Sequence, residues 1–429
     1  MVNYFYTAIG EEGGLSCSLE VVMLAPSAHK ALTAIRLSFA AILVALSTGP
    51  VLADAGFQRW IAEFRQVAIQ SGISPSVYDR AFKGVTSPDP EVLEKARYQP
   101  EFKAEPWEYF DNRINEHTIA RGRQLARDLK PWLDHIEGQY GVSRYILLAI
   151  WSMETNYGEA LRNERVMRHV PRSLATLAYA DPKRAKFART QLIAALKILQ
   201  SGDIDVHHLQ GSWAGAMGHT QFIPTSYQAY AVDADRDGRR DIWNSIPDAL
   251  ATAANLLRKN GWRTGETWGY EVILPEGRKF PSGSMPLSKW ASIGVVRANG
   301  KPFPRGSDMA ELKVPDGRKG PAFLMTNNFF VLKRYNNADT YALAVGLLAD
   351  EIAGYGGLVR DWNRPFERLS FTETQELQQR LSALGYYSGP IDGKVGSGSR
   401  DAIRAFQQRL GINPDGHPSK DVLRRLRGQ

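Results

Sequence analysis

The stretch YILLAIWSMETNYGE, residues 145–159, is the feature that most constrains the fold. Apolar residues cover every face of the helix it predicts for more than two turns, so that helix must be buried on all sides. Ser143 is a natural N-cap for it, and Gly158 a natural stop. The chain is therefore expected to fold into a globular domain around a central apolar helix.

One acidic residue, Glu154, lies in the last turn of this apolar helix. Burying a carboxylate without a partner costs free energy, so such a group keeps its proton to higher pH, as a general acid must near neutrality. Glu154 is therefore a candidate catalytic acid. The alternative is a glutamate that reaches solvent at the helix end or pairs with Arg162 or Arg165.

Two other segments carry neutral groups suited to a sugar. The loop at 211–227, GSWAGAMGHTQFIPTSY, has glycines that allow a ligand to approach the backbone closely. The segment at 328–346 offers aromatic faces and an amide. Taken alone, either segment could equally reflect ordinary packing. The candidate binding residues are Ser212, Gln221, Tyr335, Asn336 and Tyr341.

The segment DADRDGRRDIWNSIPDA, residues 233–249, resembles the first half of an EF-hand calcium loop, with alternating acids before Gly238. The twelfth position is Asn244 instead of a bidentate glutamate, so either the site is weak or Asp248 closes a longer loop. A metal-free loop of Asx-turns is the alternative. We favour a structural calcium ion, and its predicted ligands are Asp233, Asp235, Asp237, Arg239, Asp241 and Asp248.

The pattern of apolar residues predicts an α+β fold that is predominantly α, with a small β part at 268–332. Proline and mixed charges at 361–369 indicate a linker between a catalytic domain at 55–360 and a compact domain at 370–427. The longer helices are predicted at 122–138, 143–157, 183–200, 246–260 and 339–353.

The last 60 or so residues contain a short internal repeat. Asp392-Gly393 and Asp415-Gly416 each follow an apolar segment of helical character. We therefore expect two similar halves, each made of a helix and a turn.

Residues 1–53 are predicted to be a signal region for export. Basic residues precede the apolar run 37–46, and small residues at 51–53 suit cleavage before Asp54. The run is too short for a comfortable membrane span, and residues 1–22 are interpreted as a mis-called start. Cys17 does not follow an apolar run directly, so a lipoprotein is not expected.

Charge and cysteine content exclude several classes of protein. The net charge of +8 comes from basic residues scattered among acids, without long basic runs, so nucleic acid is not an expected partner. Cys17 is the single cysteine, which excludes an intramolecular disulfide and metal sites built on several thiolates.

The four internal segments together resemble the membrane-bound lytic transglycosylase B family in order and spacing, over residues 57–360. That resemblance implies a lysozyme-like catalytic domain that acts on peptidoglycan, with Glu154 as its single acid and base and the five candidate binding residues along its cleft. The region 370–427 resembles a three-helix peptidoglycan-binding domain. His219 and Thr220 depart from the usual loop of the family.

The implied reaction cleaves the β-1,4 bond between N-acetylmuramic acid and N-acetylglucosamine and leaves a 1,6-anhydromuramyl end, without a cofactor in the chemistry. Most glycosidases use two carboxylates, and neither Glu159 nor Glu164 is a convincing second one. The alternatives are a muramidase that uses water and a non-catalytic wall-binding protein. We expect a monomer in the periplasm, with glycan strands as substrate and cell-wall synthesis or remodelling proteins as further candidate partners.

Overall fold

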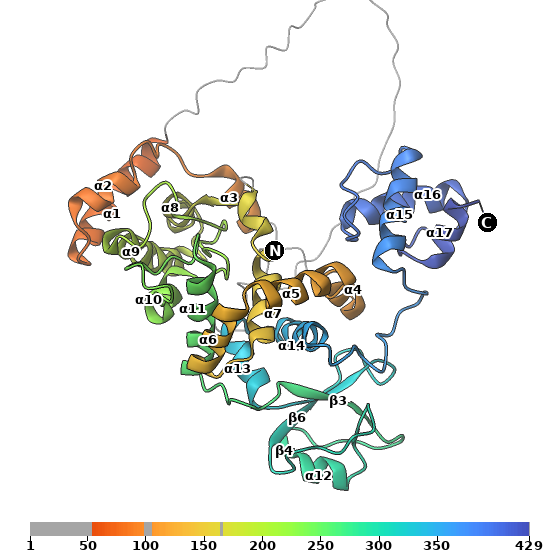
Figure 1. Cartoon of the computed structure of the whole chain (residues 1–429). Coiled ribbons are helices and arrows are strands. Elements are labelled where there is room, and N and C mark those ends of the chain that lie inside the picture. Colours follow the sequence, from red (N-terminus) through yellow and green to blue (C-terminus); the bar gives the residue numbers. More distant parts are fainter. Residues whose placement is uncertain (1–53, 98–104, 164–165, 429) are drawn as a thin grey trace, which may run out of the picture.

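The computed structural model describes residues 54–97, 105–163 and 166–428. A helical body carries a small sheet at one end and a separate helical module at its side (Figure 1). The predicted signal region, Glu164 and Arg165 lie outside the described residues.

The central apolar helix is α7, Arg144–Thr155. The Ser143 side chain accepts a hydrogen bond from the Tyr145 amide at its start, as predicted. Residues 146–152 are all buried, because α5, α6, α11 and α14 surround the helix. The apolar character on every face of this segment is thereby accounted for.

The remaining helices of the body form two groups along the chain. Those before α7 are α1 (Ala55–Gln70), α2 (Pro75–Ala81), α3 (Pro90–Arg97), α4 (Pro106–Asp111), α5 (Glu116–Asp128) and α6 (Lys130–Tyr140). Those after it are the 3-10 helix η1 (Glu159–Arg162), α8 (Val170–Ala180), α9 (Ala185–Ser201), α10 (Pro224–Tyr230), α11 (Ile246–Lys259), α13 (Asn327–Tyr335) and α14 (Asp339–Ala353). Helix α12 (Leu287–Ser292) packs on the sheet instead.

The prediction of a single helix at 122–138 was wrong, because two helices occupy that stretch. Helix α5 begins earlier, at Glu116, where Asn115 and Thr118 form a reciprocal capping box. Helix α6 starts anew at Lys130, with Pro131 in its first turn. Proline has no amide hydrogen for the preceding turn, so one helix ends and the next begins there.

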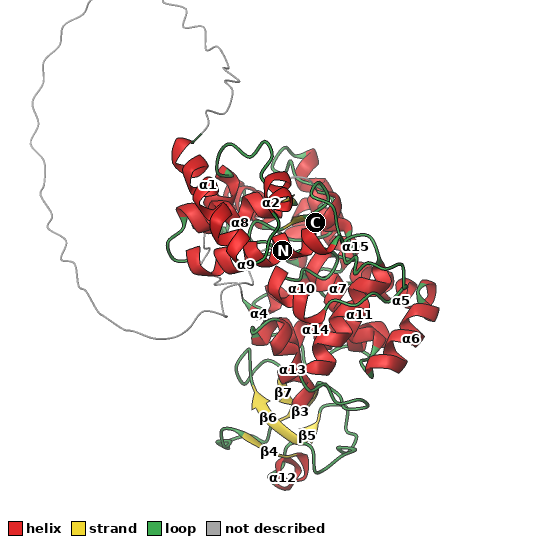
Figure 2. Cartoon of the chain, turned by 90° about the vertical axis from the view of Figure 1, so that its left-hand side faces the viewer, coloured by secondary structure: helices red, strands yellow, loops and turns green. Residues whose placement is uncertain are grey.

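The β part is a five-stranded antiparallel sheet in the order β4-β6-β7-β3-β5, below the helices in Figure 2. A separate pair, β1 (Arg168–His169) and β2 (Gln210–Gly211), joins two loops of the body. The strands of the sheet are β3 (Gly269–Ile273), β4 (Ser284–Pro286), β5 (Val296–Arg297), β6 (Met309–Lys313) and β7 (Ala322–Met325).

Strand β7 joins the sheet to the helical body because both of its faces are buried. Phe323 and Met325 pack into the main helical core, whereas Ala322 and Leu324 pack into a second core around Trp290. Side chains alternate between the two faces of a strand, so four consecutive apolar residues serve both cores.

The C-terminal module consists of α15 (Phe371–Ala383), α16 (Ser397–Arg409) and α17 (Lys420–Leu426) around its own apolar core. Its predicted repeat is confirmed by matching hydrogen bonds. Gln378 accepts from the Gly393 amide at 2.8 Å, and Gln407 accepts from the Gly416 amide at 2.9 Å. Each glutamine amide nitrogen also donates to the aspartate before that glycine.

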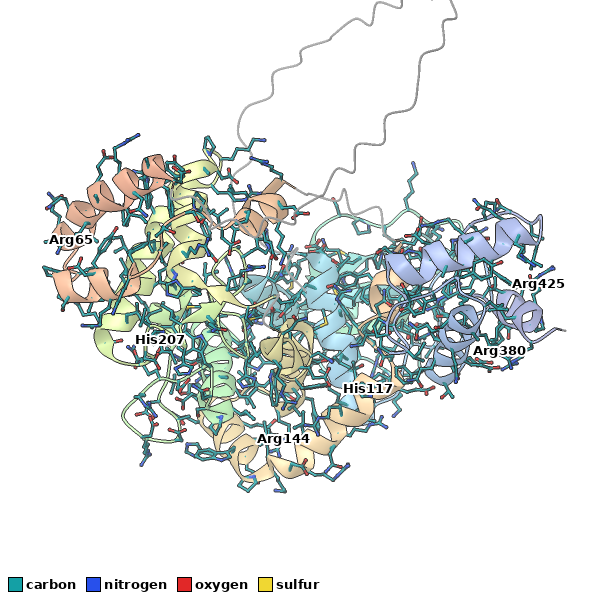
Figure 3. The ribbon with its side chains drawn as sticks, turned by 90° about the horizontal axis from the view of Figure 1, so that it is seen from above. Arg65, His117, Arg144, His207, Arg380 and Arg425 are labelled. Atoms are coloured by element: carbon teal, nitrogen blue, oxygen red, sulfur yellow. The ribbon has the colours of Figure 1, made fainter. Side chains whose placement is uncertain are left out.

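The module packs directly on the body. The Asn112 side chain donates to the Val395 carbonyl at 3.1 Å and accepts from the Val395 amide at 3.2 Å. His117, on the side of the body that faces the module in Figure 3, stacks on Phe371 with 5.7 Å between ring centroids. Arg364 of the predicted linker pairs with Asp111 at 2.7 Å.

Among the helices of the described residues, none combines the length and the apolar character needed to cross a bilayer.

Candidate functional site

The site is built around the end of α7, which stops at Thr155, two residues before the predicted end at 157. Asn156, Tyr157 and Gly158 follow it with positive φ values of 50°, 56° and 89°. Left-handed backbone is unfavourable for residues other than glycine, and such strain concentrates at functional sites. The abrupt turn leaves Glu154 in the last helical turn, next to the strained segment.

Tyr341 is the hydrogen-bonding partner of Glu154. Its hydroxyl donates to Glu154 Oε1 at 2.6 Å, and the tyrosine side chain is fully buried at the start of α14. Burial raises the pKa of Glu154 to about 7, while the Tyr341 hydrogen bond and the positive charge of Arg113 act against the rise. A carboxyl group with a pKa raised this close to neutrality can both give and take a proton.

Tyr335 connects Glu154 to the glycine-rich loop. Its ring lies parallel to that of Tyr341, with 6.4 Å between centroids, and its hydroxyl donates to the Thr220 carbonyl. Burial raises the pKa of Tyr335, and the negative charge of Glu154 adds to the rise. The structure therefore brings together three of the segments that the sequence singled out.

The other predicted binding residues form hydrogen bonds within their own loops. Ser212 is buried, and its hydroxyl accepts from the Ala216 amide at 3.1 Å. Gln221 has a positive φ of 49°, and its side chain donates to the Gly218 carbonyl at 3.0 Å. Asn336 accepts from the Ala338 amide at 3.1 Å. Gln221 and Asn336 remain partly exposed, so both can also reach a ligand.

Sequence reasoning missed the contact between Trp151 and His219. The indole nitrogen of Trp151 donates to His219 Nδ1 at 3.0 Å, so the neutral imidazole carries its hydrogen on Nε2. Burial lowers the pKa of His219 to about 4, which keeps the ring neutral. No spacing rule links these residues, because the contact spans 68 positions.

Glu159, five positions after Glu154, has a hydrogen-bonding partner of its own. It is exposed and accepts a hydrogen bond from the Asn156 side chain. Arg162, proposed as an alternative partner of Glu154, lies at the end of η1, and the hydrogen bond to Glu154 comes from Tyr341 instead.

Three of the predicted metal ligands converge. One carboxylate oxygen each of Asp233, Asp235 and Asp248 lie within 4.8 Å of one another. Oxygen atoms of carboxylates are the ligands that calcium prefers, so this group fits a calcium ion. Asp248 also accepts from the Ala234 amide at 2.7 Å and closes the loop from the start of α11.

The remaining predicted ligands have other partners in the loop. Asp237 pairs with the Arg239 side chain at 3.0 Å. Asp241 accepts from the amides of Trp243 at 3.0 Å and Asn244 at 2.9 Å. The side chains of Asp237 and Asp241 are therefore not part of the convergent group, although their backbone amides donate to it.

Comparisons with known proteins identify the family. The family model described as a transglycosylase SLT domain matches residues 56–350, and a peptidoglycan binding domain model matches residues 372–426. The chain belongs to the transglycosylase SLT domain family. The predicted resemblance and the predicted fold class are both confirmed.

Three relatives cover different shares of the chain. SltB3 from Pseudomonas aeruginosa, solved in complex with NAG-anhNAM-pentapeptide, is 44% identical, with a TM-score of 0.69 over 87% of this chain and 100% of that one. Membrane-bound lytic murein transglycosylase B of Escherichia coli K12 is 31% identical over 245 residues, which are 56% of this chain and 65% of that protein. The Escherichia coli lytic transglycosylase SLT35, solved in complex with calcium, is 25% identical, with a TM-score of 0.57 over 70% of this chain and 94% of that one.

Proposed function

We propose that this protein is a lytic transglycosylase that cleaves the β-1,4 bond between N-acetylmuramic acid and N-acetylglucosamine in peptidoglycan. The observation that carries the proposal is Glu154, a carboxyl group with a pKa of about 7 held by Tyr341 at the end of a buried helix. Membership of the transglycosylase SLT domain family and the complex of SltB3 with a peptidoglycan fragment support it.

In the proposed mechanism, Glu154 acts first as an acid and then as a base. It gives its proton to the glycosidic oxygen while the bond from that oxygen to muramyl C1 breaks. The carbonyl oxygen of the muramyl acetamide stabilises the cation that develops at C1. Glu154, now a carboxylate, removes the proton of the muramyl C6 hydroxyl as O6 bonds to C1. The products are a 1,6-anhydromuramyl end and a free N-acetylglucosamine hydroxyl, with no water consumed.

The groups around Glu154 are proposed to hold the two sugars. The Tyr335 ring would form the aromatic wall of the cleft, and the side chains of Gln221 and Asn336 would meet acetamide and hydroxyl groups. Tyr341, which is fully buried, would act through its hydrogen bond to Glu154. Ser212 is proposed to act mainly by fixing the loop backbone, since its hydroxyl is buried against the Ala216 amide.

A structural calcium ion is proposed at Asp233, Asp235 and Asp248. The convergence of the three carboxylates supports this site, as does the solved calcium complex of SLT35. Asp237, the Arg239 carbonyl and Asp241 would complete the ligand set after rearrangement of their present hydrogen bonds. Calcium would hold the loop against the start of α11 and take no part in the chemistry.

We further propose that the protein is exported to the periplasm by the signal region at 1–53 and acts there as a monomer. Its C-terminal module would attach the enzyme to glycan strands, in keeping with the family that its sequence matches. Cell-wall synthesis or remodelling proteins remain candidate partners.

The decisive experiment is mass spectrometry of fragments released from purified peptidoglycan. Muropeptides lighter by one water and resistant to borohydride reduction are expected. Reducible ends would indicate a water-using muramidase, and a complete lack of fragments would indicate a wall-binding protein without activity.

A further inference from the structure

His219, in the glycine-rich loop at 211–227, contacts the end of α7 through both its side chain and its backbone. Its ring nitrogen Nδ1 accepts from the Trp151 indole at 3.0 Å, and its carbonyl accepts from the Thr155 hydroxyl at 2.7 Å. The imidazole and indole rings meet edge to face, with 5.4 Å between centroids. Trp151 precedes Glu154 by less than one turn of helix, and Thr155 follows it directly. The turn of α7 that carries Glu154 is therefore held at both ends by one loop residue.

The same histidine packs against the left-handed turn that ends α7. The Gly158 amide donates to the Thr155 hydroxyl at 3.1 Å, so this hydroxyl links the turn to the His219 carbonyl. The His219 ring lies so close to Gly158 that a β-carbon there would be 2.7 Å from ring atom Cε1. A side chain at this position would displace the imidazole, besides being strained by the φ of 89°. The ring and the turn are therefore packed as one unit.

The backbone of His219 is fixed by contacts away from α7. Its amide donates to the Ile242 carbonyl at 2.9 Å, in the acidic loop before α11. The preceding Gly218 packs against the same carbonyl, and a β-carbon there would be 2.4 Å from its oxygen. The carbonyl of the next residue, Thr220, accepts from the Tyr335 hydroxyl. These bonds hold the loop on both sides of the histidine, so the loop sets the place where the ring meets α7.

The bond between the two rings needs an acceptor at Nδ1 of His219. Trp151 is 2% exposed, and an indole nitrogen can donate a hydrogen bond but cannot accept one. Loss of the acceptor would leave a buried donor unpaired, which costs free energy, so the indole would shift toward another acceptor or water. Because the core around Trp151 is closely packed, such a shift also moves the helical turn that includes Glu154.

We propose that His219 is a positioning residue for the proposed reaction: its Nδ1 atom holds Trp151 and thereby fixes the turn of α7 that orients the Glu154 carboxyl group. The inference rests on the proposed function, because it concerns the same site. Among the contacts of the described residues, none joins His219 to Glu154 itself, so the effect passes through Trp151 and the backbone of α7. Misplacing a proton donor slows bond breaking without removing a contact to the sugars, so kcat should change more than KM.

The test compares two substitutions of His219 in the full chain. His219→Phe keeps an aromatic ring without an acceptor, whereas His219→Asn can place an amide oxygen close to the position of Nδ1. With soluble glycan strands, His219→Phe should lower kcat by about tenfold or more, since misplacing a reacting group by about 1 Å can cost about 10²-fold. KM should stay within about twofold, and His219→Asn should recover most of kcat. Unchanged kcat in a folded His219→Phe enzyme would overturn the proposal.

A double-mutant cycle with Trp151→Phe separates this role from a general effect on the loop. If the bond between the two side chains carries the effect, Trp151→Phe alone should lower kcat, and His219→Phe should have no further effect in that background. Losses of kcat that multiply in the double variant would overturn the proposal. His135→Phe and His135→Asn are the matched controls, because His135 is an exposed histidine on α6, and both should leave kcat unchanged.

Exchange of the Trp151 indole hydrogen with solvent reports the same contact without substrate. Nitrogen-15 NMR identifies this signal by its loss in Trp151→Phe, and its exchange should be slow in the unmodified protein and in His219→Asn. If His219→Phe does not fold, His219→Asn decides the question: fast indole exchange with unchanged kcat, or slow exchange with a low kcat, would overturn the proposal. A lack of turnover by the unmodified enzyme, with slow indole exchange, would instead refute the proposed function.

Discussion

Tyr341 donates a hydrogen bond of 2.6 Å to Glu154, a residue 187 positions earlier in the chain. The contact joins the start of α14 to the end of α7, the two most apolar helices of the body. Because both helices are buried along most of their length, the distance between donor and acceptor is set by core packing. The proposed catalytic carboxyl group therefore has a fixed orientation before any substrate binds.

Replacement of Glu154 by glutamine should reduce turnover of peptidoglycan by about 10³-fold or more, since the amide can neither give nor take the required proton. Fragment release followed by chromatography measures the effect. Glu159→Gln is the control, because that exposed carboxylate lies five residues away and should leave the rate within about twofold of the unmodified enzyme. An active Glu154→Gln enzyme would rule out the proposed role.

The pH dependence of kcat/KM should show that Glu154 acts as an acid. The bond-breaking step needs the protonated carboxyl, so kcat/KM should fall as pH rises through about 7. The Tyr341 hydrogen bond stabilises the charged carboxylate, so replacement of Tyr341 by phenylalanine should raise the pKa of Glu154. The fall in kcat/KM, the alkaline limb of the profile, should then occur at higher pH. Tyr335→Phe is the control, because Tyr335 donates to Thr220 instead. A limb that moves to lower pH in Tyr341→Phe would contradict the assignment.

Stability should depend on pH through the same group. The folded protein binds the Glu154 proton more tightly than the unfolded chain, so its stabilising effect is complete below about pH 4.5 and is lost by about pH 7. The loss is at most about 3 kcal/mol. Glutamine at position 154 does not titrate, so the stability of Glu154→Gln relative to the unmodified protein should increase across this range. Chemical denaturation at several pH values tests this, and a constant difference would disprove it.

Calcium should stabilise the protein through the acidic loop. Addition of calcium to chelated protein should raise the unfolding temperature, because binding to the folded state alone shifts the equilibrium. Asp233→Asn together with Asp235→Asn should remove most of that rise, whereas Asp237→Asn should have a smaller effect because Asp237 is paired with Arg239. Calorimetry with and without calcium makes the comparison, and an unchanged response in the double variant would place any bound ion elsewhere.

The two glutamines of the C-terminal module should act alike. Gln378→Ala or Gln407→Ala would leave a glycine amide without its acceptor, at a cost of about 1–3 kcal/mol each. Asp392 and Asp415 would keep the backbone amides of Lys394 and His417 as donors. Hydrogen exchange followed by mass spectrometry should show faster exchange at Gly393 in the first variant and at Gly416 in the second. If the Gly393 and Gly416 amides exchanged at the same rate in both variants and in the unmodified protein, the glutamines would not protect them.

Local sequence signals predicted the helices well where caps and periodicity agreed. The range 339–353 predicted for α14 matches the structure, and the start of α7 follows its Ser143 cap. The end of α7 was predicted less well, because Asn156 and Tyr157 take a left-handed conformation that residues other than glycine rarely adopt.

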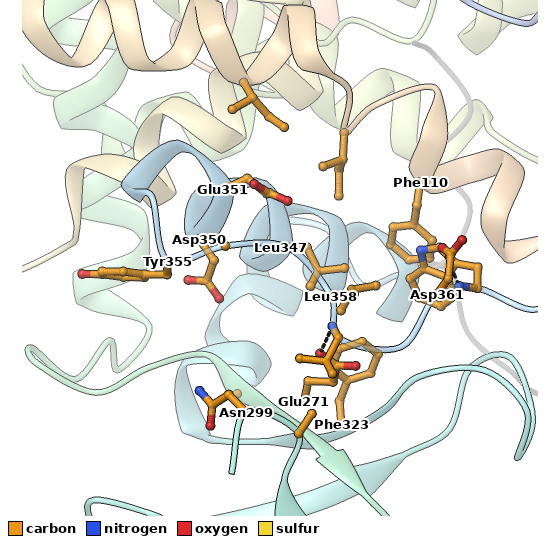
Figure 4. Close-up of a pocket in the computed structure, with 18 of the residues that line it drawn as sticks. Phe110, Glu271, Asn299, Phe323, Leu347, Asp350, Glu351, Tyr355, Leu358 and Asp361 are labelled. Atoms are coloured by element: carbon orange, nitrogen blue, oxygen red, sulfur yellow. Dashed lines mark hydrogen bonds between the residues drawn. The ribbon is translucent and has the colours of Figure 1, made fainter. Parts of the chain in front are cut away.

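The chemistry of the site depended on contacts that sequence cannot reveal. Glu154 could be singled out because it is an acid in an apolar helix. Tyr341 was singled out too, but as a sugar-binding residue, because no sequence pattern shows that its hydroxyl meets the Glu154 carboxylate. The cavity of about 1270 Å³ between β3, the end of α14 and the segment 355–362 (Figure 4) escaped sequence reasoning altogether. Its acids come from β3, α14 and separate loops, and only the packing of the sheet under α14 brings them together.

The paired hydrogen bonds between Asn112 and Val395 also affect how an attached enzyme can move. If the module were joined by a flexible linker, the active site could reach many positions around the point where the module binds the wall. A module fixed against α4 and α5 instead keeps a constant distance between the glycan-binding module and the active site. On an immobile wall, such an enzyme is expected to release fragments with a narrow range of lengths.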